Sequence, residues 1–170
     1  MKENSKSILD QSIDEKGVLR LIMDDQINKN ALSQIMITKL TNAIKIASSD
    51  NSIKVIVLAA KGNVFCSGHN LKEITDARNN EDEGASYFID LFKLCSSLMQ
   101  LIVNSPKPVI AEVNGVATAA GCQLVASCDL AISSDAAKFA TPGVNIGLFC
   151  STPMVALSRN VNKKDALKML

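Results

Sequence analysis

The chain has 170 residues, of which 47% are hydrophobic and 21% charged, and its formal net charge is +1. This composition is typical of a globular domain with a sizeable core. The near-neutral charge, the lack of a dense Lys/Arg block and an aromatic content of 4% argue against nucleic acid as a main partner. No run of 18 apolar residues occurs, so the sequence predicts no membrane insertion.

The first sixteen residues are polar and carry both charge signs. They lack the apolar centre of a secretory signal, and their four acidic residues and absence of Arg do not fit a transit peptide. Residues 1–16 are therefore predicted to be a polar lead-in to one folded unit over residues 17–170. On these grounds we expect a cytoplasmic location.

Strand-like and helix-like apolar patterns alternate along the chain, which predicts an α/β fold with right-handed crossovers. The run over residues 54–60 is continuously apolar, as expected for a strand covered on both faces of a parallel sheet. Further strands are expected at 17–23, 109–113 and 130–133, helices at 31–47, 87–103 and 119–127, a helical or irregular stretch from 71, loops at 61–70 and 141–147, and a last helix from 162.

The last residue, Leu170, lies inside an apolar pattern with Ala166 and Leu167, and no Gly or Pro stop signal precedes it. A helix that begins there would normally continue. We therefore expect the chain to be the N-terminal portion of a longer fold, although a natural frayed terminus would give the same pattern.

The five cysteines form no CxxC motif, and most lie in apolar surroundings. This odd number favours buried free thiols of an intracellular protein over a disulfide framework. His69 is the only histidine and could not complete a zinc site, so no metal is expected.

Two junctions between a strand and the following loop consist of small residues. The first runs from Phe65 to His69 and the second from Ala117 to Gly121, where a helix is expected to begin. Small side chains let a ligand approach the backbone, and two N–H groups that converge on one oxygen form an oxyanion hole. Small residues at a helix start also serve close packing, so the residues alone leave both interpretations open.

Several short motifs stand in one order along the chain: Asn30-Ala31-Leu32-Ser33, Phe65-Cys66-Ser67-Gly68 with Leu71-Lys72-Glu73, Pro108-Val109-Ile110-Ala111, Val113-Asn114-Gly115, Ala120-Gly121-Cys122, Cys128-Asp129, and Phe139-Ala140-Thr141-Pro142 with Gly147. With these motifs the chain resembles the crotonase (enoyl-CoA hydratase/isomerase) superfamily over roughly residues 17–170. The resemblance implies a spiral of ββα units that here lacks the family's C-terminal helical part. In the family that part completes the acyl-CoA site and drives assembly into trimers or hexamers. Relatives are often mitochondrial, which makes the mitochondrial matrix the alternative location.

The resemblance also implies an acyl-CoA thioester as ligand or substrate and no further cofactor. The thioester carbonyl would lie between the backbone N–H groups of Ser67 and Ala120, which would stabilise an enolate-like intermediate. Lys29 and Lys72 could meet the CoA phosphates, although solvated lysines are the commoner case. The remaining substrate-binding positions implied are Cys66, Gly68, His69, Gly121, Thr141 and Pro142.

The sequence departs from the family at both catalytic glutamates. Gln123 stands where the first is expected, after the Gly-Cys pair, and Gly143 stands where the second follows a proline. An amide forms hydrogen bonds but cannot relay a proton, and losing one general acid or base costs about 10²–10⁴ in rate. Ordinary enoyl-CoA hydration is therefore in doubt.

Three hypotheses remain open at this point. In the first, the chain is an enoyl-CoA hydratase-like lyase or isomerase of fatty acyl-CoA metabolism with an unidentified proton source. In the second, it is a non-catalytic acyl-CoA-binding or regulatory paralogue. In the third, it is an inactive truncated form. His69 titrates in the useful range, although a structural histidine is the commoner case. Glu112 lies in an apolar strand and is expected to find a partner there. Ser67-Gly68-His69 does not form a serine-hydrolase elbow.

Overall fold

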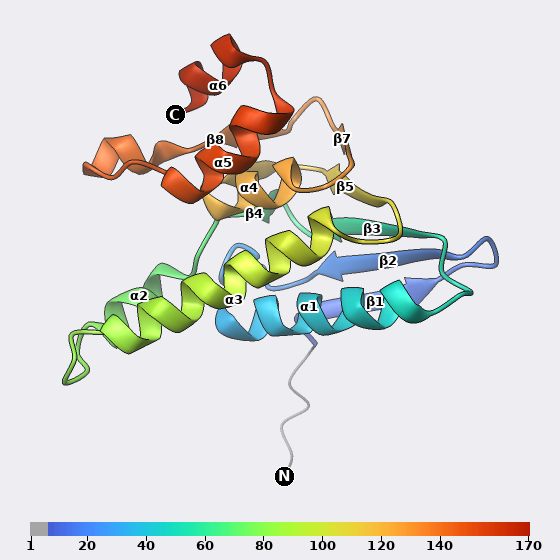
Figure 1. Ribbon diagram of the computed structural model, residues 1–170, viewed down its shortest axis with the longest axis horizontal. Helices are drawn as coiled ribbons and strands as arrows, with labels where there is room; N and C mark the ends of the chain where they lie inside the picture. The colour runs from blue at the N-terminus through green and yellow to red at the C-terminus, as the bar shows by residue number, and fades with distance from the viewer. Residues whose placement is uncertain (1–6) are drawn as a thin grey trace.

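The computed structural model describes residues 7–170 as an α/β molecule with two sheets (Figure 1). The larger sheet has five strands in the order β1-β2-β3-β5-β7, and the smaller has three in the order β4-β6-β8. The elements are β1 Leu9–Ile13, β2 Val18–Met23, α1 Gln34–Ser49, β3 Val55–Ala60, β4 Val64–Cys66, α2 Leu71–Ala77, α3 Ala85–Val103, β5 Val109–Val113, β6 Val116–Thr118, α4 Ala120–Ala126, β7 Leu130–Ser133, β8 Lys138–Ala140, the 3₁₀ helix η1 Pro142–Ile146, α5 Ser151–Asn160 and α6 Lys163–Met169.

From β3 onward, consecutive strands go alternately to the two sheets. Strands β3, β5 and β7 pair side by side in the larger sheet, whereas β4, β6 and β8, which follow them in the chain, pair in the smaller sheet. All these pairings are parallel, so each return requires a crossover connection. The predicted α/β fold is thus confirmed as a repeated strand–strand–helix unit.

The central strand and first long helix follow directly from their sequences. β3 buries four consecutive residues because it lies between β2 and β5 in the larger sheet, as its continuous apolar run predicted. Helix α1 begins at Gln34, three residues later than predicted, because Ser33 caps it: the Ser33 hydroxyl oxygen accepts the Met36 N–H at 3.1 Å.

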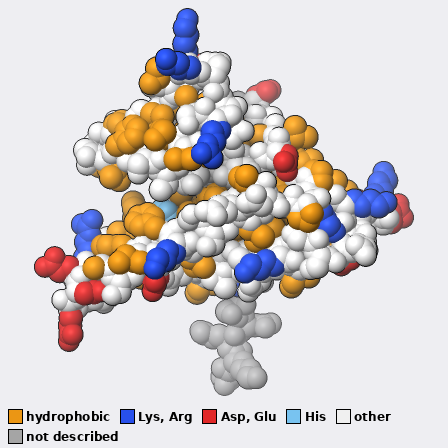
Figure 2. Space-filling model, in the orientation of Figure 1, with side chains coloured by type: hydrophobic (Ala, Val, Ile, Leu, Met, Phe, Trp, Pro, Cys, Tyr) orange, Lys and Arg blue, Asp and Glu red, His pale blue; other side chains and the backbone are white. Residues whose placement is uncertain are grey.

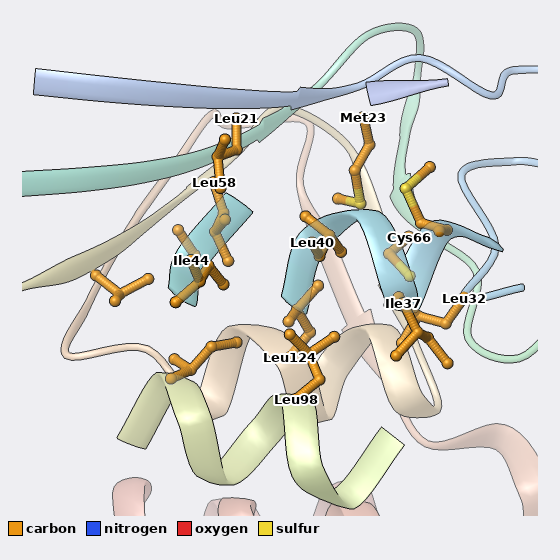
Figure 3. Packing of buried hydrophobic residues seen from close by; sticks show 14 of the residues in the cluster. Leu21, Met23, Leu32, Ile37, Leu40, Ile44, Leu58, Cys66, Leu98 and Leu124 are labelled. Carbon is orange, nitrogen blue, oxygen red and sulfur yellow. The ribbon is translucent and has the colours of Figure 1, made fainter. Parts of the chain in front are cut away.

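The hydrophobic core lies between the larger sheet and the helices α1, α3 and α4 (Figure 3). Leu21 and Leu58 reach it from the sheet, Leu40 from α1, Leu98 from α3 and Leu124 from α4. Each of these side chains is at most 1% exposed. Burial of one such side chain contributes about 1.5–3 kcal/mol, so these contacts fix the layers on which the site is built.

The structure corrects the predicted lead-in and several short elements. Leu9–Ile13, assigned by sequence to the polar lead-in, form β1, which pairs antiparallel with β2 at the sheet edge. Its polar residues fit because an edge strand leaves one side exposed. Residues 1–6 lie outside the described part of the chain. Strands β4, β6 and β8 and helix α5 were not predicted, and β4 lies within the expected loop at 61–70.

Helix α3 is the one helix among residues 7–170 that is long and apolar enough to cross a membrane by length and composition. It packs against α1, and its five buried side chains belong to the hydrophobic core. Core helices of globular proteins pass the same test, so this property of α3 is weak evidence for a membrane span.

Asn30 ties the loop before α1 to strand β4. Its side chain is 1% exposed; it accepts the Asp25 N–H at 2.8 Å and donates to the Lys61 and Val64 carbonyls at 3.0 and 2.7 Å. The neighbouring backbone is left-handed, with φ of 56° at Lys29 and 51° at Asn30. Asn adopts this conformation more readily than most residues.

The Asn30→Ala change is expected to lower the free energy of unfolding by about 3 kcal/mol, since it leaves buried backbone groups unpaired and places Ala at a left-handed position. Urea unfolding followed by circular dichroism measures this. Asn114→Ala is the matched control, because the exposed Asn114 amide also donates to two carbonyls, those of Ala60 and Gly62. A loss at Asn30 no larger than at Asn114 would contradict the assignment.

Candidate functional site

The two small-residue junctions lie against each other. Gly68 has φ +94°, and a Cβ there would lie 3.0 Å from the Ala119 Cβ and 3.3 Å from the Ala120 nitrogen. A Cβ on Gly121 would lie 2.2 Å from the Cys66 carbonyl oxygen. The end of β4 thus packs backbone to backbone on the start of α4, with no room for a side chain between them.

A strained turn starts helix α4 at this contact. Ala119 has φ 52° and ψ −122°, a conformation that costs a non-glycine residue about 1–3 kcal/mol. Its N–H donates to the Ala140 carbonyl at 3.0 Å, so the end of β8 holds the turn in place. The next N–H, that of Ala120, belongs to the first helical turn and has no hydrogen-bond partner within residues 7–170.

The second predicted donor is already engaged. The Ser67 N–H donates to the Lys29 carbonyl at 3.2 Å, and the Ser67 carbonyl accepts the Thr118 hydroxyl at 3.0 Å. A ligand oxygen would therefore have to share the Ser67 N–H with Lys29 or displace that carbonyl. Of the two predicted N–H donors, only the one at Ala120 is unoccupied in the described part of the chain.

Gln123 lies one helical turn beyond Ala120 and lines a cavity. The cavity measures about 670 Å³ and lies between α3, α4 and α5, with Phe92, Cys95, Met99 and Arg159 in its wall. The Gln123 side chain is 9% exposed, and its Oε1 is buried with no hydrogen-bond partner among the described residues. The position of the first family acid thus faces a ligand-sized space with an unpaired amide oxygen.

Gly143, the position of the second acid, has no such space. It is buried in η1, and a Cβ there would lie 2.6 Å from the Leu148 carbonyl oxygen and 2.7 Å from the Cys150 Sγ. Thr141 is 2% exposed, and its hydroxyl donates to the Met169 carbonyl. Pro142 is exposed at the start of η1. The structure therefore does not bring Thr141, Pro142 or Gly143 into the wall of the cavity.

His69 lies between the Gly68 junction and the cavity wall. Its ring contacts Phe92 edge-to-face, with centroids 5.4 Å apart, and both ring nitrogens are buried without a hydrogen-bond partner among residues 7–170. Burial lowers the pKa of the imidazole, while the nearby Leu32 carbonyl and the Glu73 charge act in the opposite direction. The Leu32 carbonyl does not reach hydrogen-bonding geometry with either nitrogen. Figure 2 shows the single histidine of the chain in a hollow of the surface.

Three other acidic side chains are engaged in hydrogen bonds or an ion pair. Glu112 is half-exposed and pairs with Arg20 at 2.7 Å, the partner that its place in an apolar strand predicted. Glu73 accepts the Tyr87 hydroxyl at 3.0 Å and the Gln34 N–H at 3.2 Å. Asp129 accepts the Val109 N–H at 2.8 Å and so fixes the start of β5.

All five cysteines are free, as predicted, and all but Cys128 are buried. Burial raises the pKa of the Cys66 and Cys128 thiols to about 12, and that of Cys95 and Cys122 to about 11. Thiols with such values remain protonated near neutral pH and are poor nucleophiles. Within residues 7–170 no group of three or more His, Cys, Asp or Glu side chains is arranged to hold a metal ion.

The sequence reasoning missed the wall that α5 contributes to the cavity. Arg159 brings a positive charge to this wall, and Val155 brings an apolar side chain. The sequence carries a short signal for the start of this helix. Ser151 and Thr152 precede Pro153, and proline is tolerated in the first turn of a helix.

The sequence is similar to known proteins over most of its length. Residues 14–170 match the family model described as enoyl-CoA hydratase/isomerase. The chain is 54% identical over 156 residues to the mitochondrial enoyl-CoA hydratase domain-containing protein 3 of Xenopus laevis, covering 92% of this chain and 51% of that protein. The runs over residues 117–134 and 139–153 resemble this subgroup, and the match confirms that resemblance.

Solved structures show the same fold. An enoyl-CoA hydratase from Mycobacterium smegmatis superposes with a TM-score of 0.88 at 47% identity, covering 97% of this chain and 62% of that one. The human enoyl-CoA hydratase domain-containing protein 3 gives 0.87 at 48% identity, with 96% and 62% covered. The chain thus spans about half the length of the curated relative and under two thirds of these solved chains. The match over residues 14–170 and the shared spiral of ββα units place the chain in the enoyl-CoA hydratase/isomerase (crotonase) family.

Proposed function

We propose that this chain binds an acyl-CoA thioester and presents its carbonyl oxygen to the backbone N–H of Ala120. The observation that carries the proposal is that this N–H has no partner in the described chain, although it lies against the Ser67–Gly68 junction. Membership of the family and the hydratase names of its relatives support CoA thioesters as the ligand class. We propose that the chain needs no cofactor beyond the thioester.

The chemistry that this arrangement favours is stabilisation of an enolate. A backbone donor aimed at the carbonyl oxygen gains strength as negative charge develops there, and one such donor is worth about 2.7–4 kcal/mol in comparable sites. The Ser67 N–H adds to it only when the ligand oxygen competes with the Lys29 carbonyl. We place the chain in fatty acyl-CoA metabolism as a hydratase-like protein on this basis.

The second candidate is a non-catalytic acyl-CoA-binding or regulatory paralogue. Gln123 cannot act as an acid or base, and Gly143 lies where a side chain does not fit. Both observations remove the usual proton donors and leave the backbone donor in place. Turnover of no thioester, with binding retained, would favour this candidate.

Calorimetric titration with butyryl-CoA, with free CoA as reference, tests the binding proposal. Ala120→Pro deletes the donor at the first helical position, where proline is compatible with a helix, and is expected to weaken butyryl-CoA binding about tenfold. Ala120→Gly is the matched control because it keeps the N–H. Equal binding by the two variants, with circular dichroism spectra unchanged, would rule out the Ala120 donor.

We also propose the mitochondrial matrix as the location, because relatives are named mitochondrial; these names do not support the cytoplasmic expectation.

Assembly into homotrimers or hexamers is proposed on two grounds, the family and the apolar side chains that β7 and the segment after β8 leave exposed. Light scattering measures the assembly. A cooperative thermal transition would contradict the alternative of an inactive, poorly folded form. The most exposed of these side chains are Leu130, Ile132, Val144, Ile146 and Leu148.

A further inference from the structure

Three of the four buried side-chain atoms that lack a hydrogen-bond partner among residues 7–170 belong to Gln123 and His69, two of the predicted site residues. One is the Gln123 Oε1 and the other two are the ring nitrogens of His69; the fourth, on Thr41, lies in helix α1. A buried polar group without a partner costs about 1–3 kcal/mol, so such groups call for an explanation, and a ligand that pairs with them supplies one.

His69 is joined to the proposed oxyanion position through the backbone. It follows Gly68, whose Cα faces the Ala119–Ala120 turn so closely that a Cβ there would lie 3.3 Å from the Ala120 nitrogen. On its other side the ring touches Phe92, which lines the cavity together with Gln123. The imidazole therefore lies between the Gly68 junction and Phe92 in the cavity wall, and Figure 2 shows the pale blue of the histidine within a surface hollow.

The burial of this imidazole favours its neutral form. Burial lowers its pKa, and the titratable group that faces it is Glu73, on α2, which is itself held by the Tyr87 hydroxyl and the Gln34 N–H. From the loop before α1 comes the Leu32 carbonyl, and from α3 the uncharged Phe92. A neutral imidazole has one acceptor nitrogen that can take up a proton from a bound ligand.

We propose that His69 is the catalytic base that removes a proton from the carbon α to the thioester carbonyl, the task left without a carboxylate by Gln123 and Gly143. This rests on the proposed binding of the thioester. The α C–H bond breaks and an N–H bond forms on the imidazole. The C–H electron pair becomes the enolate double bond, and the carbonyl π pair moves to the oxygen that the Ala120 N–H holds. The imidazolium then returns a proton to carbon, so no oxidant or reductant takes part.

Exchange of the α-protons of butyryl-CoA in D₂O, followed by NMR, tests this, with binding measured by calorimetry on the same samples. The wild-type chain is expected to exchange faster as pH rises through deprotonation of the imidazole. His69→Gln retains a polar side chain that cannot take up a proton. It is expected to exchange about 10²–10⁴-fold more slowly, with no pH rise, and to bind butyryl-CoA within about threefold of wild type. Glu112→Gln, at an exposed ion pair far from the cavity, is the control for unchanged exchange.

The outcomes separate the two proposals. Absence of butyryl-CoA binding would overturn the proposed function, and the base assignment with it. Binding without wild-type exchange, or with exchange in His69→Gln within tenfold of wild type, would overturn the base assignment alone. His69→Phe, which fills the ring's place against Phe92, repeats the test should the Gln variant unfold.

Discussion

Replacing Gly121 with alanine is expected to lower the free energy of unfolding by about 3 kcal/mol and to abolish butyryl-CoA binding. The added Cβ would lie 2.2 Å from the Cys66 carbonyl oxygen and 2.8 Å from the Cys66 carbonyl carbon, both backbone atoms that cannot rotate away. The end of β4 and the start of α4 would have to separate, which moves the Ala120 N–H from the Ser67–Gly68 junction. Urea unfolding and calorimetric titration measure the two effects.

Gly147→Ala is the control for this prediction. Gly147 has φ +72°, but a Cβ there meets no atom within 4 Å, so the variant carries only the backbone cost of a left-handed alanine, about 1–2 kcal/mol. Binding should persist in it. If both glycine variants lose the same stability and Gly121→Ala still binds the thioester, close packing at Gly121 does not hold the site.

Restoring the family's second acid by Gly143→Glu is expected to fail. The new side chain would meet the Leu148 carbonyl oxygen and the Cys150 Sγ at 2.6 and 2.7 Å from its Cβ, so the segment from η1 to α5 must shift. We expect a loss of about 2–3 kcal/mol in the free energy of unfolding and no hydration of crotonyl-CoA. Thermal unfolding and a hydration assay measure this.

Gln123→Glu is the informative partner for that variant. Glutamate has nearly the shape of glutamine, so the fold should tolerate it, but burial raises the pKa of a carboxyl at this position and favours its neutral form. The single variant is therefore expected to fold like wild type. A double variant that folds normally and hydrates crotonyl-CoA faster than Gln123→Glu would show that η1 adapts to a side chain at position 143.

The long elements could be predicted because each carries its own pattern. The apolar run of β3 and the helical spacing in α1 and α3 depend on nearby residues alone. Strands β4, β6 and β8 have three residues each, too few to show a period of two, and they exist because the chain passes alternately between two sheets. Strand β1 was not predicted because it lies at the edge of the larger sheet and contains polar residues, which do not give the apolar pattern of a buried strand.

The candidate site was predictable in its backbone and not in its side chains. The small residues around Gly68 and Ala120 indicated a close approach, which the structure shows. Leu148 and Cys150 leave no room for a side chain at Gly143. The Ser67 N–H is occupied because it donates to the Lys29 carbonyl. These contacts depend on how loops fold back in three dimensions, which no local pattern specifies.

The backbone contact between β4 and α4 bears on how function could be lost or changed in such a fold. The glycine that lets the two segments touch also keeps the Ala120 N–H in place, so a substitution at Gly121 that displaced this donor would also damage the fold. Selection for folding alone would then maintain the position of this backbone donor, even in a lineage that no longer needed turnover. Side chains such as Gln123 and His69 are free of that constraint. They can therefore be replaced without separating the end of β4 from the start of α4.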